Sequence, residues 1–155
     1  FSRMYKADQN IQINPADTFD FIANKIVSSH PFSLAYVEYF VQQIGTPSNF
    51  DINYQDDETG YTLLMIASML DRADIVQSLL AGRENQPQTK ANPDLVSRDG
   101  KTAIMYAIDN RDIQVSLILF YAGAHIDDRS FEILHRVLFM MNGVIEGRFN
   151  LNSLR

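Results

Sequence analysis

Oxygen-bearing side chains alternate along one short stretch of the chain, as they do in a calcium-binding loop. These side chains belong to Asp51, Asn53, Gln55, Asp57 and Glu58. Such a loop needs a glycine at its sixth position for a sharp turn and a bidentate glutamate at its twelfth. Counted from Asp51, these positions hold Asp56 and Thr62, so the sequence argues against a calcium site.

A second candidate metal site combines His125, the nearby Asp127 and Asp128, and His135. Transition-metal sites need three or four ligands with converging geometry. We expect instead that His125 lies in a loop and that His135 lies on a solvated helix face. The sequence therefore predicts no metal and no cofactor.

Motifs of catalytic sites are missing from the sequence. It contains no Gly-x-Ser-x-Gly elbow, no Walker loop and no dinucleotide-binding fingerprint, and without cysteine it has no thiol nucleophile. The adjacent carboxylates Asp56 and Asp57 fall in an expected hairpin tip, where they lack the desolvation that tunes a general acid. We expect a protein that is not an enzyme, and a metal-dependent hydrolase is the weakest hypothesis.

The balance of charges argues against nucleic acid as a partner. The chain carries 19 acidic and 13 basic residues, a net charge of −6. Binding to phosphates requires clustered Lys and Arg, and the sequence has no such cluster. Two readings of the charge remain: it matches a basic or apolar protein surface, or it only keeps the protein soluble.

The sequence predicts neither membrane insertion nor a signal peptide. Its longest apolar stretches, 118–124 and 137–141, fall short of the roughly 18 residues that suggest a membrane span. The lack of cysteine and of Asn-x-Ser/Thr sites favours an intracellular, cytoplasmic protein.

An internal duplication sets the pattern of elements. Residues 60–81 and 100–122 align without a gap at an offset of 40. The identical pairs are Gly60 and Gly100, Thr62 and Thr102, Met65 and Met105, Ala67 and Ala107, and Leu79 and Leu119. Hydrophobic character is kept at most other key positions, which is the signature of a repeat array.

Each copy resembles the ankyrin repeat. The family pattern contains a turn glycine, a Thr-Pro-Leu-His run, a small alanine and an Ile-Val-x-x-Leu-Leu second helix, and the first copy follows it from Gly60 to Leu80. Family repeats are about 33 residues long, which implies about seven extra residues here. They fit between Leu80 and Ala91, where the polar segment 82–90 has the composition of a surface loop. The resemblance implies an all-α, ankyrin-type solenoid of stacked helix-turn-helix repeats with hairpin loops.

Both copies depart from the family pattern, because they lack the proline of the first helical turn and the histidine that ties neighbouring repeats. Met65 and Met105 stand at the histidine position, and we interpret both as core fillers. At the bend between the helices, where the backbone tends to be left-handed, Asp71 and Arg111 replace glycine at a steric cost. We expect modest stability, with each repeat dependent on burial by its neighbours.

A divergent first repeat is expected before the duplication. Apolar residues at helical spacing predict helices over 15–30 and 33–44, the first capped by Asp17 or Thr18. Thr18 and Ala23 keep the five-residue separation of the threonine and alanine in the two later copies. The spacing between its helices is several residues longer than in those copies.

A capping helix is expected after the repeats, over 130–142, with Ser130 as its N-cap. Its block 137–141 is apolar all round, whereas the outer face of a terminal helix should be wet. Either the tail folds back over this block, or the chain is cut from a longer protein.

These elements predict one repeat domain with short flanking segments. The expected organisation is a partly disordered extension over 1–14, an ankyrin repeat domain over 15–142, and a tail or further segment over 143–155. Within the domain, the repeats are 15–53, 54–93 and 94–127, followed by the capping helix 130–142.

The resemblance also implies a concave binding surface made of hairpin tips and first helices, with no catalytic residues. The family's variable binding positions correspond to Glu58, Thr59, Tyr61, Met69 and Leu70 in the first copy and to Arg98, Asp99, Lys101, Asp109 and Asn110 in the second. Met69 and Leu70 stand out because these positions are normally polar, and exposed apolar groups beside Tyr61 would anchor a partner. The alternative is that they pack against the preceding repeat.

We interpret the chain as a protein–protein interaction module, a scaffold or targeting domain whose partner is another protein. The alternative is a non-catalytic regulatory or substrate-targeting domain of a larger enzyme, such as a secreted bacterial effector that would act in the host cytoplasm. The apolar block 137–141 favours that alternative, because it needs a cover.

Overall fold

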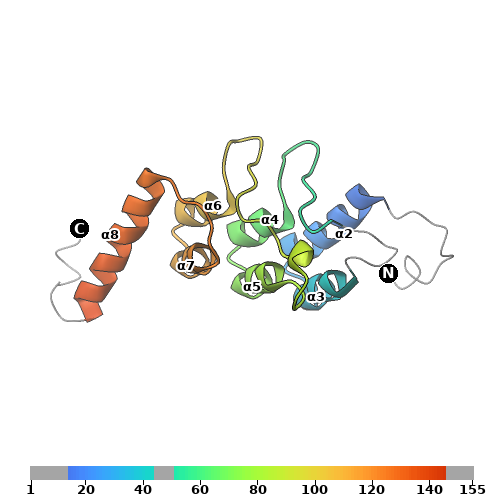
Figure 1. Ribbon diagram of the computed structural model, residues 1–155, viewed down its shortest axis with the longest axis horizontal. Coiled ribbons are helices and arrows are strands. Elements are labelled where there is room, and N and C mark those ends of the chain that lie inside the picture. Colours follow the sequence, from blue (N-terminus) through green and yellow to red (C-terminus); the bar gives the residue numbers. More distant parts are fainter. Residues whose placement is uncertain (1–13, 44–50, 146–155) are drawn as a thin grey trace.

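Paired helices make up the fold, which this computed structural model describes for residues 14–43 and 51–145 (Figure 1). The pairs are α2 (Pro15–Val27) with α3 (Ser33–Gln43), α4 (Leu63–Met69) with α5 (Ala73–Ala81), and α6 (Ala103–Asp109) with α7 (Ile113–Tyr121). A last helix, α8 (Asp128–Ile145), follows the pairs. None of the helices in the described ranges is both long and apolar enough to cross a membrane.

The pairs stack into two rows. In one row α4 packs against α2 and α6, and in the other α5 packs against α3 and α7. Buried side chains from both rows form one continuous core. Two loops, 54–61 and 95–101, project from the edge of the row that contains α4 and α6 (Figure 1). Over the described residues the secondary structure is helical apart from an isolated bridge, so the predicted all-α stack of helix pairs is confirmed.

The duplicated threonines open equivalent helices. Thr62 and Thr102 are the N-cap residues of α4 and α6, which have seven residues each. The hydroxyl of Thr62 accepts a hydrogen bond from the backbone N–H of Met65 at 3.1 Å, and this satisfies one of the unpaired donors at the helix start. Thr102 caps α6 through its backbone alone, since its side chain makes no cap bond.

The three turns between paired helices share one left-handed residue. Ser29, Asp71 and Arg111 have φ values of +52°, +55° and +58°. In each turn the next N–H donates to a carbonyl five residues earlier, as in a Schellman motif. These bonds run from His30 to Lys25 at 3.1 Å, from Arg72 to Ala67 at 3.0 Å and from Asp112 to Ala107 at 2.9 Å. The left-handed bends predicted at Asp71 and Arg111 are confirmed.

The shared turn sets the register of the first repeat and corrects the predicted one. Lys25 takes the place of Ala67, so the predicted match of Ala23 is wrong by two residues. Thr18 is an interior residue of α2 and not a helix start. The cause is the difference in helix length, since α2 has 13 residues and α4 has seven. A count of five residues from Thr18 therefore stops at Ala23, two residues before Lys25.

The start and end of α2 also differ from the prediction. Asn14 caps the helix in place of Asp17 or Thr18, and its side chain accepts a hydrogen bond from the N–H of Ala16 at 3.0 Å. Pro15 fills the first helical position, where a missing N–H costs nothing. The helix ends before residue 28, and His30 lies in the turn that follows.

The last helix is longer at both ends than the predicted 130–142, because α8 spans Asp128–Ile145. Ser130 is not its cap. Instead, the carboxylate of Asp127 accepts a hydrogen bond from the N–H of Ser130 at 2.6 Å. Hydrogen bonds from Ser130 lower the pKa of Asp127. The predicted N-terminal extension as far as residue 13, the helix end at residue 44 and the tail beyond residue 145 lie outside the described residues.

The extra residues of the first copy lie where the sequence placed them. The N–H of Ala124 donates to the carbonyl of Leu119, five positions earlier, at 3.1 Å. The N–H of Ala91 donates to the carbonyl of Leu79, twelve positions earlier, at 2.9 Å. Because Leu79 and Leu119 are equivalent, seven residues are inserted in the segment between Leu80 and Ala91.

Thr89 organises this inserted segment, which contains a single 3-10 turn (Pro87–Thr89). The side chain of Thr89 is fully buried. Its hydroxyl accepts a hydrogen bond from the N–H of Arg83 and donates one to the carbonyl of Gln86, each at 2.7 Å. The insertion is therefore a loop folded against the end of α5.

Two carboxylates of neighbouring repeats interact at the inter-helix turns. Asp112 caps α7 and accepts a hydrogen bond from the N–H of Val115 at 3.1 Å. Burial, followed by the hydrogen bond and the charge of Asp71, raises the pKa of Asp112. A raised carboxyl pKa means that stability is highest when the group is protonated and falls as pH rises through the folded-state pKa.

Replacing Asp71 by Asn should therefore stabilise the protein most at neutral pH. At pH 7 the variant loses a like charge beside Asp112, and we expect its Tm to rise by about 2 °C. Asn also tolerates the left-handed backbone well, but that gain does not depend on pH. Thermal unfolding between pH 4 and pH 7 checks this prediction. A Tm gain that stays constant over the range would contradict the electrostatic account.

Candidate functional site

The residues that the sequence assigns to a binding surface lie on two adjacent loops and at the ends of two helices. Glu58, Thr59 and Tyr61 belong to loop 54–61, Arg98, Asp99 and Lys101 to loop 95–101, and Met69, Leu70, Asp109 and Asn110 to the ends of α4 and α6. Both loops stand at the edge of the row α2, α4 and α6 (Figure 1). We call these residues and the side chains that hold them the hairpin face.

The first loop is a hairpin built around Asp56. Its N–H donates to the carbonyl of Tyr61 at 3.0 Å. The carboxylate of Asp56 accepts hydrogen bonds from the N–H of Thr59 at 3.0 Å and from its hydroxyl at 2.9 Å. The hydroxyl bond and then the backbone bond lower the pKa of Asp56. The N–H and hydroxyl of Thr59 are thus used in hydrogen bonds within the hairpin, while Glu58 is exposed at the tip.

Bonds between the two loops hold them side by side. The N–H of Arg98 donates to the carbonyl of Thr59 at 3.0 Å. The side-chain amide of Gln55 donates to the carbonyl of Gly60 at 3.1 Å and to that of Val96 at 2.9 Å. The sequence suggested Gln55 only as a calcium ligand, because the acceptor at Val96 belongs to the next repeat and leaves no mark on the pattern around Gln55.

Tyr106 joins several of the predicted positions, although the sequence analysis did not single it out. Its ring packs edge-on against Tyr61 with centroids 5.8 Å apart, and its hydroxyl hydrogen-bonds the hydroxyl of Ser97 at 2.7 Å. The ammonium of Lys101 lies 5.6 Å from the ring centroid and pairs with Asp109 at 2.8 Å. The structure thus brings Tyr61, Lys101 and Asp109 together around one tyrosine.

The local environment accounts for the protonation behaviour of this group. Burial raises the pKa of Tyr106, and the hydrogen bond to Asp109 is the main cause of a raised pKa of Lys101. Both residues keep their usual charge near neutral pH. One signal in the sequence could have identified Tyr106. It aligns with Ile66 of the first copy, an apolar position, and a buried tyrosine there needs a hydrogen-bond partner for its hydroxyl.

Met69 and Leu70 differ in exposure. Leu70 is 43% exposed, whereas Met69 and Tyr61 are half-buried and pack against the core. The backbone carbonyl of Met69 accepts a hydrogen bond from the side-chain amide of Asn110 at 2.9 Å, which ties the end of α4 to the next repeat. Leu70 is therefore exposed next to Met69, whose backbone is fixed by a contact between repeats. Among the two aligned methionines, Met65 is buried as expected, while Met105 is only half-buried.

The histidines lie where the sequence placed them. His125 is in the loop between α7 and α8, where its Nδ1 lies 3.0 Å from the carboxylate of Asp94. His135 is exposed on α8 and stacks on Phe131, with centroids 6.0 Å apart. Within the described part of the chain, no cluster of three or more His, Asp or Glu side chains is arranged to hold a metal ion.

Comparison with known sequences agrees with this architecture. The family model described as ankyrin repeats, with three copies, matches residues 32–130. The match runs from the turn before α3 to the start of α8 and includes both duplicated units. No curated protein matches the chain significantly. The matched length, together with the stacked helix pairs and their paired hairpins, shows that the chain belongs to the ankyrin repeat family.

Proposed function

We propose that this chain binds a partner protein through the hairpin face. Ankyrin repeats are generally protein–protein interaction modules and are typically non-catalytic. The observation that carries the proposal is Leu70, a large aliphatic side chain that is 43% exposed at the end of α4, on the same face as the exposed Val96 of loop 95–101. Interfaces draw most of their affinity from a few such anchors on a pre-formed surface.

The charges on the two loops indicate the chemistry of the partner. Asp57, Glu58 and Asp99 are exposed on the loops, together with the exposed Arg98 and the partly exposed Lys101, which pairs with Asp109. The net charge of the whole chain is −6. A complementary partner surface would place an apolar group against Leu70 and basic groups opposite the loop tips, which would also speed association at low salt.

Co-purification from the native cell with tagged variants tests this proposal. We expect Leu70→Ser to weaken capture of the partner about tenfold or more, and the triple variant Tyr61→Ala, Met69→Ser, Leu70→Ser to abolish it. Tyr121→Ser is the matched control, because Tyr121 is 81% exposed at the end of α7 and is not part of the hairpin face. Undiminished capture by the folded triple variant would reject the hairpin face as the binding site.

A second reading is favoured by the surface of α8. Phe131, Ile133 and Met141 are 47%, 40% and 44% exposed, an unusual apolar display for a terminal helix. This display fits a regulatory or targeting domain that packs against an enzyme within one polypeptide. The mass of the native polypeptide, measured by blotting with an antibody to this chain, decides the matter. A native product of the same mass as this chain would rule the second reading out.

A further inference from the structure

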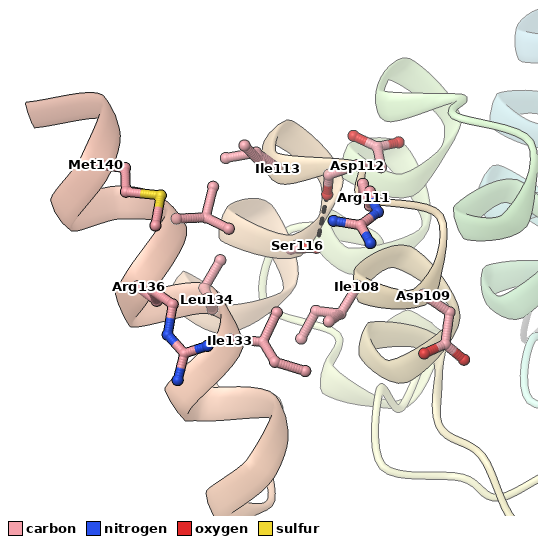
Figure 2. Close-up of a pocket in the computed structure, with 11 residues that line it drawn as sticks. Ile108, Asp109, Arg111, Asp112, Ile113, Ser116, Ile133, Leu134, Arg136 and Met140 are labelled. Carbon is pink, nitrogen blue, oxygen red and sulfur yellow. Dashed lines mark hydrogen bonds between the residues drawn. The ribbon is translucent and has the colours of Figure 1, made fainter. Parts of the chain in front are cut away.

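A recess lies between the last helix pair and α8. It is a cavity of about 620 Å³, bounded on one side by α6, α7 and the turn between them and on the other by α8 (Figure 2). Its aliphatic lining comes from Ile108 and Ile113 on the first side and from Ile133, Val137 and Met140 on α8. Ile133 points toward Ile108, where α8 crosses α6 (Figure 2).

The position of this cavity in the stack indicates the shape of its occupant. Along one row α5 covers α3 and α7 covers α5, and along the other α8 packs on α6. α8 packs mainly on α6 and meets α7 near its own start, where the rings of Phe120 and Phe131 lie 6.4 Å apart; in both figures α8 leans away from α7 toward its C-terminal end. In the part of the chain that the structure describes, the next place in the row α3, α5, α7 is therefore not filled. Because the unfilled position continues a row of helices and is bounded by helices, its shape suits another helix that packs against them.

The charged side chains around the cavity indicate the chemistry of that helix. Asp109 pairs with Lys101 at 2.8 Å, and Asp112 caps α7 through Oδ1, whereas its Oδ2 is buried without a hydrogen-bond partner among the described residues. Arg136 pairs with Glu132 at 3.0 Å. Arg111 is exposed, and its guanidinium has no ion pair or hydrogen bond among the described residues. The edge of the cavity thus carries one cation that is free to pair with an incoming carboxylate.

We propose that this cavity docks an amphipathic helix of a partner protein, with an apolar stripe in the cavity and an acidic residue paired with Arg111. The stripe contacts Ile113 on α7 and Ile133, Val137 and Met140 on α8. These three α8 residues recur at helical spacing and so line one side of the recess. The docking surface shares Asp109 with the hairpin face, but Leu70 does not line it, and the proposal does not depend on what binds at Leu70.

Two designed peptides test the proposal on the intact chain labelled at its isoleucine methyl groups. Both are helical with leucines at i, i+3, i+4 and i+7, and their flanking residues are glutamates in one and lysines in the other. The glutamate peptide should shift the methyl resonances of Ile113 and Ile133 and leave that of Ile75, buried in α5, unchanged. It should bind about tenfold more tightly than the lysine peptide.

Charge reversal separates specific docking from simple apolar contact. Arg111→Glu should invert the preference between the two peptides, whereas Arg98→Glu, the same charge change on the hairpin face, should leave it unaltered. Equal affinity for both peptides, or no shift at Ile113 and Ile133, would overturn the proposal. So would shifts that appear only after removal of residues 146–155, or only on dilution of a dimer, because the occupant would then be this chain itself. None of these outcomes bears on capture through Leu70.

Discussion

Gly60→Ala should destabilise the protein by about 2–4 kcal/mol, whereas Gly100→Ala should cost only about 1 kcal/mol. The two glycines occupy equivalent repeat positions with φ of +71° and +77°, so both variants place alanine in a left-handed backbone. A Cβ at residue 60 would lie 2.9 Å from the backbone nitrogen of Arg98 and 3.2 Å from the Cα of Ser97. A Cβ at residue 100 would meet nothing within 4 Å.

The difference between these two variants measures the packing of one hairpin on the next. Loop 54–61 packs against loop 95–101, whereas within the described residues α8, and not a further hairpin, comes after α6 and α7. Urea unfolding followed by far-UV circular dichroism gives both changes in the free energy of unfolding. Equal losses for the two variants would mean that the loops do not pack against each other as described.

Ile104→Ala should lower the free energy of unfolding by about 2–5 kcal/mol without splitting the transition. Ile104 has no exposed surface and lies in α6, which packs against α4 and α7. The substitution would therefore leave a new cavity in the middle of the stack. Because the helices are short, each depends on burial by its neighbours, and the array should unfold as one unit. The exposed Leu70 is the control, and Leu70→Ala should cost less than about 1 kcal/mol.

Two probes of unfolding check this cooperativity. The chain has seven tyrosines and no tryptophan, so tyrosine fluorescence can be followed alongside circular dichroism. The two curves should coincide for the native protein and for Ile104→Ala. Separate midpoints in either protein would contradict a single cooperative stack.

The sequence predicted best those features that a single repeat specifies locally. Left-handed turn residues and an insertion between Leu80 and Ala91 both follow from residue types at fixed spacing, and the structure has both of them. The first repeat was misaligned because α2 is longer than α4, and the Asn14–Pro15 pair competes successfully with Asp17 and Thr18 as a helix start. Helix length depends on packing against neighbours, which the repeat pattern does not encode.

For the candidate residues, the sequence predicted the loops and helix ends on which they lie, but not the contacts that hold them. The alignment located the loops and helix ends correctly, yet the bond between Tyr106 and Ser97 and the bridge from Gln55 to Val96 join side chains to partners that the repeat pattern does not mark. The half-burial of Met69 likewise depends on the tertiary packing of α4. Contacts of this kind set the shape of the surface, so its exposed aliphatic side chains are Leu70 and Val96 and do not include Met69.

Photo-crosslinking in the native cell tests most directly whether a partner docks on the hairpin face. A benzophenone amino acid is placed at Leu70 in one variant and at Gln77, an exposed residue of α5, in the other. The account predicts one strong protein adduct from position 70, competed by the untagged native chain, and none from position 77. An adduct from position 77 with none from position 70 would contradict it.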